Sequence, residues 1–392
     1  MNLFRVIRTA CLKIVRVLLS ILIPVKKGRI IFQSSPDYSD NARAFSDYLL
    51  DNTNYNLIWA VNDSSLFKDT DRIKFINNDN TKSVFKKLKY IYYTVTSQYL
   101  ISTHSAFLFA NKRKQTFVCL WHGMPLKRIA IWQNPNNKNY LNNTSYILST
   151  SCYYVPILAK CFGKKENEIL PLGYPRNDWL FVKSDVLDKL DFKVGEGEKL
   201  ILFLPTFRQT NGGDYYDTKS DSFASEVVNF RSSDSLASIN SFLKSINIKM
   251  IIKPHPAESM QTDNIRLSNI LIVPHSVFYE KDIQLNQVMH YADALITDFS
   301  GAYCDFLNLN RPIGFVLSDF KEYKENRGFV FDNILDYLAG SRLYTNQDFK
   351  DFCTNVSQGI DTTCQDRSRV MRFFNDNSDA NNCYRLAKYL SL

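Results

Sequence analysis

Short apolar runs alternate with longer segments of mixed polarity along most of this chain. Each run is three to six residues long, and helix-length segments separate most of them. This alternation is typical of βαβ units, in which parallel strands are buried between layers of helices. We therefore predict an α/β protein with parallel sheets, whose strands lie at residues 29–32, 56–61, 117–120, 146–148, 168–170, 200–204, 249–252, 270–273, 294–296 and 313–316.

A polar stretch at residues 183–199, which contains Gly195-Glu196-Gly197-Glu198, separates the first five runs from the last five. With 392 residues, the chain is long enough for two domains. We expect two Rossmann-like domains, residues 28–190 and 191–375, that face each other across a cleft. Ligands of such folds bind at the carboxyl ends of the strands.

Residues 1–27 have one basic face and one apolar face when they are placed on a helix. At about 100° per residue, the basic side chains fall within roughly 140° of arc. The longest uncharged run, residues 17–25, is too short to span a bilayer, and no small-residue cleavage site follows it. We predict a helix that lies in an anionic membrane interface, at the cytoplasmic face. The alternative is a helix packed on its own domain. The basic residues are Arg5, Arg8, Lys13 and Arg16.

The chain carries a net charge of +9 at pH 7, from 48 Lys and Arg against 39 Asp and Glu. This excess indicates an anionic partner such as a nucleotide, a phosphopolymer or a lipid surface. No zinc-finger, RNP or homeodomain pattern is present, so we expect no nucleic-acid partner. The eight cysteines form no CxxC pair, and several lie in apolar runs, which is typical of reduced thiols in a cytosolic protein.

The apolar run at residues 117–120 leads directly to a histidine, His122, which Gly123 and Pro125 follow closely. A buried parallel strand delivers the residues after it to the mouth of the sheet. Glycine permits a ligand to approach the backbone closely, and Lys127 adds a nearby cation. Because the chain has only five histidines, we interpret His122 as a candidate for chemistry. The alternative is a histidine that merely caps a strand.

Basic residues also follow two predicted strands of the second half. His255 stands between two prolines after residues 249–252, next to Lys253-Pro254, and its restricted backbone suits a phosphate contact. Arg208 follows residues 200–204, where its guanidinium could fork onto a phosphate. The alternatives are a turn histidine and a surface salt bridge.

A third strand of the second half, residues 294–296, leads into Thr297 and Asp298, and Ser300 stands at the N-cap of a predicted helix. Free backbone N–H groups at such a helix start form an anion site, and ordinary capping is the alternative. No carboxylate pair has convincing metal-ligand spacing, so the sequence indicates no metal. Asp298 and Asp305 are the carboxylates that remain available to Mg²⁺.

Together these segments resemble a known family, the CDP-glycerol glycerophosphotransferases of teichoic acid and capsule assembly. The matches follow the family's order through most of the chain. They are SDNAR at 39–43, STHS at 102–105, WHGMPLKRI at 121–129, LGYPRND at 172–178, LPTFR at 204–208, KPHP at 253–256, ITDFSGAYCDFLNLNRPIGF at 296–315 and ENRGF at 325–329.

The resemblance implies a GT-B fold, a CDP-alditol donor, and a C-terminal helix at residues 376–392 that crosses back onto the first domain. It also implies that an acceptor hydroxyl attacks the phosphorus of the glycerol phosphate and that CMP leaves. His122 matches the family's catalytic base, and His255 matches the histidine assigned to the donor phosphate. The residues that we assign to the donor site are Arg208, Lys253, Thr297, Asp298, Ser300, Asp305 and Arg327.

We predict a membrane-associated enzyme that moves glycerol phosphate from CDP-glycerol to a lipid-linked saccharide or a polymer end. The alternatives are the same chemistry with CDP-ribitol, a GT-B transferase of nucleotide sugars, and a non-catalytic nucleotide-binding partner. The chain departs from the family pattern at Met124, Gln209 and Gly301, where the family has threonine, an acidic residue and a second serine. Its length favours a single-addition, primase-like enzyme over a long-chain polymerase.

Overall fold

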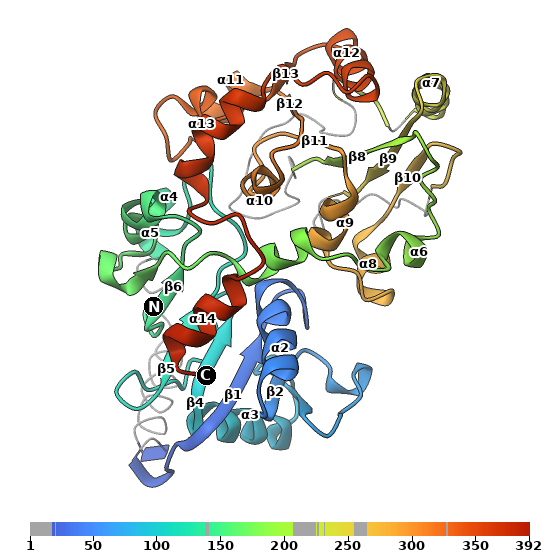
Figure 1. The fold of residues 1–392 in the computed structure, drawn as a ribbon. Coiled ribbons are helices and arrows are strands. Elements are labelled where there is room, and N and C mark those ends of the chain that lie inside the picture. The colour runs from blue at the N-terminus through green and yellow to red at the C-terminus, as the bar shows by residue number, and fades with distance from the viewer. Residues whose placement is uncertain are drawn as a thin grey trace.

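The computed structural model of this chain describes residues 18–392 except 20, 138–140, 207–224, 226, 231, 255–264 and 327. Its strands form two sheets, one in each half of the chain (Figure 1). Neighbouring strands are parallel throughout both sheets. The predicted α/β class with parallel sheets is therefore confirmed. No helix in the described ranges is long and apolar enough to cross a bilayer.

The first sheet has seven strands in the order β3-β2-β1-β4-β5-β6-β7. The carboxyl-terminal residues of its central strands β1, β4 and β5 are buried, since helices cover both faces. The strands are β1 (Lys26–Gln33), β2 (Leu57–Val61), β3 (Ile73–Asn77), β4 (Ser97–Ser102), β5 (Thr116–Cys119), β6 (Tyr146–Leu148) and β7 (Ile169–Leu170).

The second sheet has six strands in the order β10-β9-β8-β11-β12-β13. In both sheets the strand order reverses beside the first strand of the half, between β1 and β4 and between β8 and β11. The strands are β8 (Lys199–Leu204), β9 (Ile248–Ile252), β10 (Ile270–Ile272), β11 (Ala294–Thr297), β12 (Ile313–Val316) and β13 (Ser341–Leu343).

The connections between strands are helical. The α-helices are α2 (Asp40–Asn52), α3 (Val84–Thr96), α4 (Ala130–Gln133), α5 (Val155–Phe162), α6 (Val186–Leu190), α7 (Ser233–Ser245), α8 (His275–Glu280), α9 (Leu285–Tyr291), α10 (Ala302–Phe306), α11 (Phe320–Asn326), α12 (Asn346–Ser357), α13 (Cys364–Phe374) and α14 (Asn382–Leu390). The 3₁₀ segments are η1 (Ser64–Leu66), η2 (Pro135–Asn137), η3 (Cys152–Tyr154), η4 (Glu166–Glu168), η5 (Pro175–Phe181), η6 (Leu307–Leu309) and η7 (Ile334–Asp336).

All ten predicted strands are present, and three more, β3, β4 and β13, were not predicted. Two of these are edge strands that carry a charged residue, Lys74 in β3 and Arg342 in β13. The central strand β4 begins directly after the end of α3, and Ser97 and Gln98 open it. Because no turn residue marks that change from helix to strand, the sequence pattern hides it.

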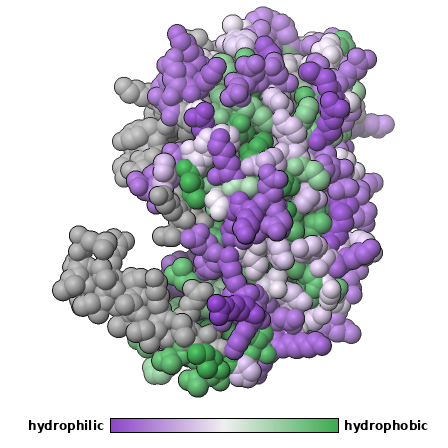
Figure 2. Space-filling model, turned by 90° about the vertical axis from the view of Figure 1, so that its left-hand side faces the viewer, coloured by the Kyte–Doolittle hydropathy of each residue, from purple (hydrophilic) through white to green (hydrophobic). Residues whose placement is uncertain are grey.

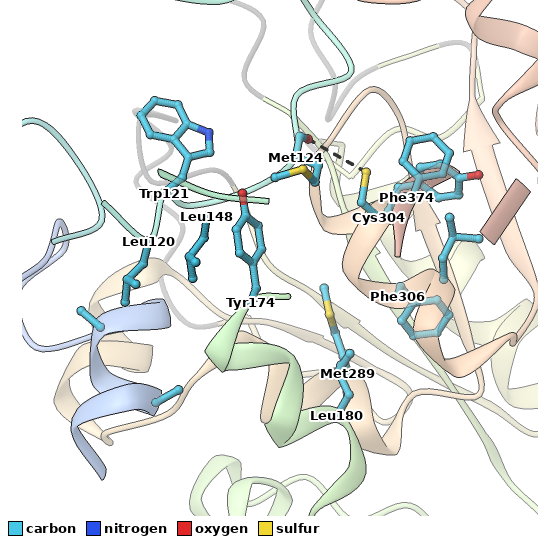
Figure 3. Packing of buried hydrophobic residues seen from close by; sticks show 14 of the residues in the cluster. Leu120, Trp121, Met124, Leu148, Tyr174, Leu180, Met289, Cys304, Phe306 and Phe374 are labelled. Atoms are coloured by element: carbon cyan, nitrogen blue, oxygen red, sulfur yellow. Dashed lines mark hydrogen bonds between the residues drawn. The ribbon is translucent and has the colours of Figure 1, made fainter. Parts of the chain in front are cut away.

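One continuous hydrophobic core joins the two halves of the chain. Figure 3 shows part of it, where Trp121 and Met124 from the first half lie in the same cluster as Cys304 and Phe306 from α10. Residues 183–199, the expected linker, include the short helix α6, whose Val186 and Leu190 are buried.

The last helix, α14, crosses from the second half of the chain onto the first sheet's layer of helices (Figure 1). Asp178 accepts hydrogen bonds from the backbone N–H groups of Asn382, at 2.8 Å, and Cys383, at 2.9 Å. At its far end, the hydroxyl of Tyr99 donates to the carbonyl oxygen of Leu390 at 2.8 Å. The first turn of the helix lies against Gly173.

Replacing Gly173 with alanine should loosen this attachment. Gly173 has a φ of +85°, and an added Cβ would lie 1.8 Å from Oδ1 of Asn382. Gly197 is a matched control, since its φ is +77° and an added Cβ would meet nothing within 4 Å. A left-handed backbone costs an alanine about 1–2 kcal/mol at either site. Gly173→Ala should therefore lower the free energy of unfolding in urea by more than Gly197→Ala, and equal losses would contradict the tight contact.

Candidate functional site

A cavity of about 690 Å³ lies between the two halves of the chain. Residues 36–40, which follow β1, line it from the first half, together with His122 and Arg176. Pro205, which follows β8, and residues 300–302, which follow β11, line it from the second half. These are carboxyl ends of strands at the two points where strand order reverses, the usual ligand position in parallel sheets. The volume suits a nucleotide-sized ligand.

His122 lies where sequence analysis expected it, in the loop after β5 and in the wall of the cavity. Its Nδ1 lies 3.0 Å from the carbonyl oxygen of Thr103. A carbonyl oxygen can only accept, so Nδ1 carries the proton and Nε2 keeps its lone pair. The ring edge is open to the cavity, yet burial among protein atoms lowers the pKa of His122, outweighing the Thr103 hydrogen bond and the Asp40 charge, which raise it. The geometry gives a neutral imidazole that can take a proton.

A side chain of α2 holds the backbone next to His122 in place. The side-chain amide of Asn41 donates to the carbonyl oxygen of Trp121 at 3.0 Å, and Trp121 has a φ of +55°. Such a conformation is costly for a large side chain, so it persists only where neighbours fix it. The Oδ1 atom of Asn41 in turn accepts the backbone N–H of Arg176 at 3.1 Å.

Arg176, in η5, binds two carboxylates that are far apart in sequence. Its Nη1 donates to Oδ1 of Asp40 at 2.7 Å and to the carbonyl oxygen of His122 at 3.0 Å. Its Nη2 donates to Oδ2 of Asp305, in α10, at 2.6 Å. Burial alone would lower the pKa of Arg176, but the two carboxylates outweigh it and raise the pKa. One guanidinium therefore connects the loop after β5 that carries His122, called here the histidine loop, to Asp40 of the first half and to Asp305 of the second half.

Asp305 was expected to bind the donor, and it lines the cavity with a side chain that is 2% exposed. Burial raises the pKa of its carboxyl group, while the charge of Arg176 lowers it. Asp40 also makes a contact across the cleft, since its backbone N–H donates to Oε1 of Gln284 at 3.0 Å.

Two basic side chains of the second half face the cavity. Lys253 follows β9, and burial lowers its pKa to about 8. His275 begins α8, and burial followed by the charge of Lys253 lowers its pKa to about 4. Among the described residues no carboxylate forms an ion pair with Lys253, and Nδ1 of His275 is buried without a hydrogen-bond partner. An anion in the cavity would pair with the ammonium group of Lys253.

Ser300 lines the cavity, and its hydroxyl accepts the backbone N–H of Ala302 at 3.3 Å. The N-cap position that was predicted for Ser300 is held by Gly301, one residue later. Next to it, a Cβ added to Gly301 would lie 3.0 Å from the carbonyl oxygen of Met124. Figure 3 shows the same carbonyl facing the thiol of Cys304, at 4.0 Å. The start of α10 is thus packed against the loop that carries His122.

Thr297 and Asp298 turn away from the cavity. The hydroxyl of Thr297 donates to the carbonyl oxygen of Leu204 at 2.7 Å. Oδ2 of Asp298 accepts both the backbone N–H and the hydroxyl of Thr206, each at 2.9 Å. Both residues are at most 2% exposed, and they join the ends of β8 and β11. Their assignment to the donor stays a prediction, and in this structure they position the loops that reach the cavity.

Three of the predicted residues, Arg208, His255 and Arg327, lie outside the described residues. The neighbours of Arg327 do pack on the histidine loop, since the backbone N–H of Val330 donates to the carbonyl oxygen of Leu126 at 2.9 Å. The described ranges contain no group of three His, Cys, Asp or Glu residues arranged to hold a metal ion.

Sequence reasoning did not assign a role to Arg176, Asp40 or His275. The first two lay inside the segments LGYPRND and SDNAR, which were matched to the family without a role for these side chains. His275 follows a predicted strand and a proline, the same pattern that singled out His255. That pattern could have identified it.

Removing the guanidinium of Arg176 should damage both stability and turnover. Arg176→Ala leaves the carboxylate of Asp305 buried without its cation, a change that typically costs about 3–5 kcal/mol. Arg369 is a control, because its ion pair with Asp366 is exposed, with side chains 62% and 59% accessible. Arg369→Ala should change unfolding in urea little, as is usual for exposed pairs. If the two variants unfold alike, Arg176 does not hold the halves together.

This chain is similar to known proteins in both sequence and fold. Residues 15–392 match the family described as CDP-Glycerol:Poly(glycerophosphate) glycerophosphotransferase. The teichoic acid poly(glycerol phosphate) polymerase of Bacillus spizizenii strain W23 is 29% identical over 335 residues, which is 79% of each chain. The corresponding polymerase of Bacillus subtilis strain 168 is 27% identical over 331 residues, 79% of this chain but 41% of its own length.

Among solved structures, the wall teichoic acid polymerase TagF superposes with a TM-score of 0.74 at 20% identity, covering 94% of this chain and 89% of that one. At this identity the likeness concerns the fold. The match over nearly the whole sequence establishes the family, and this chain belongs to the CDP-glycerol:poly(glycerophosphate) glycerophosphotransferases.

Proposed function

We propose that this chain transfers glycerol phosphate from CDP-glycerol to a hydroxyl of a lipid-linked saccharide or of a growing teichoic acid or capsule polymer, releasing CMP. The observation that carries this proposal is the placement of His122. Its Nδ1 is committed to the carbonyl of Thr103, so a neutral Nε2 is left at a cavity whose other wall presents Lys253 and His275.

In this reaction the acceptor hydroxyl attacks the phosphorus that carries glycerol. Nε2 of His122 takes the hydroxyl proton, a contribution of typically 10²–10⁴-fold. The bond between the two phosphates breaks, and its electron pair leaves with CMP. The charged ammonium group of Lys253 is proposed to neutralise negative charge on the diphosphate, with the neutral ring of His275 beside it, and stabilising that charge is the larger requirement of phosphoryl transfer. His255 and Arg208 are proposed to act beside them.

The architecture that fits is GT-B, with residues 28–190 on the acceptor side and residues 191–375 on the donor side. We propose that the protein attaches to the cytoplasmic face of the membrane through residues 1–27. Of that segment the structure describes residues 18–19 and 21–27, and Leu18, Ile21 and Leu22 are more than half exposed. The seven cysteines in the described ranges are free thiols, which suits a reducing compartment.

One assay tests the activity. The protein is incubated with CDP-glycerol, CDP-ribitol or UDP-sugars and a lipid-linked saccharide, and the released nucleotide and the number of units added are measured. We expect CMP from CDP-glycerol only when acceptor is present. His122→Ala should lower turnover by about 10²–10⁴-fold and preserve donor binding, because the base is lost and the phosphate contacts remain.

His290→Ala is the matched control for that variant, since His290 donates to the carbonyl of Leu180 and does not line the cavity. Release of UDP alone would refute the donor class. Loss of donor binding in His122→Ala, with chemistry retained, would exchange the roles of base and phosphate ligand.

Donor binding should weaken as the pH rises through about 8, the pKa of Lys253 in the absence of ligand. Below that pH the ammonium is charged and attracts the diphosphate, and above it the neutral amine does not. Lys253→Arg should keep its charge and remove this pH dependence. Titration calorimetry with CDP-glycerol between pH 7 and pH 9.5 measures the effect. An identical pH profile for both proteins would show that Lys253 does not bind the donor phosphates.

A further inference from the structure

Helix α3 exposes apolar side chains on its outer face. Val84 is 68% exposed, Phe85 is 85%, Leu88 is 57% and Tyr92 is 40%. At about 100° per residue these four side chains fall within roughly 100° of arc, so they form one stripe. Tyr90 and Thr94 lie on the opposite side of the helix and are buried, and in the last turn Val95 and Thr96 are buried as well, so the exposed stripe belongs to the first two and a half turns.

Lysines surround this stripe. Lys82, Lys86, Lys87 and Lys89 are all exposed, and residues 80–100 contain no acidic residue. Two more cations, Lys26 and Arg29, lie at the far end of the helix, beside the hydroxyl of Tyr92. Arg29, in β1, has its guanidinium 5.5 Å from the ring centroid of Tyr92 and donates to the hydroxyl of Thr96 at 2.6 Å. The surface is therefore apolar along its centre and strongly basic around it.

The surface continues onto the segment that leads into β1. Lys26 pairs with Ser97, the residue that directly follows α3, so the start of β1 lies beside the end of the helix. Just before it, Leu18 is 51% exposed, Ile21 67% and Leu22 73%. Figure 2 shows hydrophobic side chains gathered at the lower end of the molecule, where Figure 1 places α3 and the start of β1.

The composition of this face selects the kind of partner. Lysine is depleted in the cores of protein–protein interfaces, whereas four lysines stand among the exposed residues here. A nucleic-acid contact would use the cations and leave an apolar stripe in water. A bilayer with anionic lipids satisfies both features, because apolar side chains enter the acyl boundary while lysines reach back to the headgroups.

We propose that α3 is a docking surface for anionic phospholipid bilayers, distinct from residues 1–27. This proposal rests on the proposed function, because a lipid-linked acceptor requires the enzyme to work at the membrane. Two attachment sites would fix the orientation of the first sheet on the bilayer, whereas one site alone would fix only its distance.

Vesicle sedimentation with the full chain tests this proposal, with phosphatidylcholine vesicles containing or lacking 30% phosphatidylglycerol. The double variant Phe85→Ser/Leu88→Ser should weaken binding to the anionic vesicles at least tenfold. Lys86→Gln/Lys87→Gln should weaken it too, and should reduce its dependence on salt. Tyr344→Ser/Ile360→Ser is the matched control, because these residues are 45% and 46% exposed elsewhere on the second half and should leave binding unchanged.

Unchanged vesicle binding in both α3 variants would overturn the proposal. A change in oligomeric state by light scattering, with vesicle binding intact, would also overturn it and assign the stripe to a second copy of the chain. CMP release with a water-soluble acceptor keeps this test separate from the activity. The α3 variants should retain that turnover, and a protein that binds vesicles through α3 without releasing CMP would refute the proposed function alone.

Discussion

The buried guanidinium of Arg176 is the contact on which the arrangement of the site depends. It joins Asp40 of the first half to Asp305 of the second half and also binds the carbonyl oxygen of His122. A buried arginine is costly unless charged partners and hydrogen bonds satisfy it, so the three oxygens must stay in place together. The relative position of the two halves and the direction of the histidine loop are therefore set by the same set of bonds.

This arrangement explains how the cavity can have two chemically different walls. The first half supplies the proposed base, His122, and burial disfavours its protonated form. The second half supplies the ammonium group of Lys253, which forms no ion pair with a described carboxylate, and beside it the imidazole of His275, which the same charge keeps neutral. In the proposed mechanism, proton acceptance and phosphate binding therefore belong to opposite halves of the chain.

Two departures from the family pattern, Met124 and Gly301, turn out to be one local feature. The carbonyl of Met124 lies close to the position that a Cβ on Gly301 would occupy. Met124 itself is 1% exposed and belongs to the core that joins the halves. The change beside the proposed base therefore concerns how tightly α10 packs on the histidine loop, and it leaves the imidazole in the cavity wall.

The sequence alone determined the α/β class, the ten strands with clear apolar runs, and the position of His122, Lys253 and Ser300 at strand ends. These features are local, because a buried strand delivers the next few residues to the edge of its sheet. It did not reveal β4, which joins a helix without a turn. Nor did it reveal the role of Arg176, whose partners Asp40 and Asp305 lie 136 and 129 residues away. Only the tertiary structure could decide that Thr297 and Asp298 hold strand ends together while Arg176 enters the site, because burial and pairing depend on which elements meet in space.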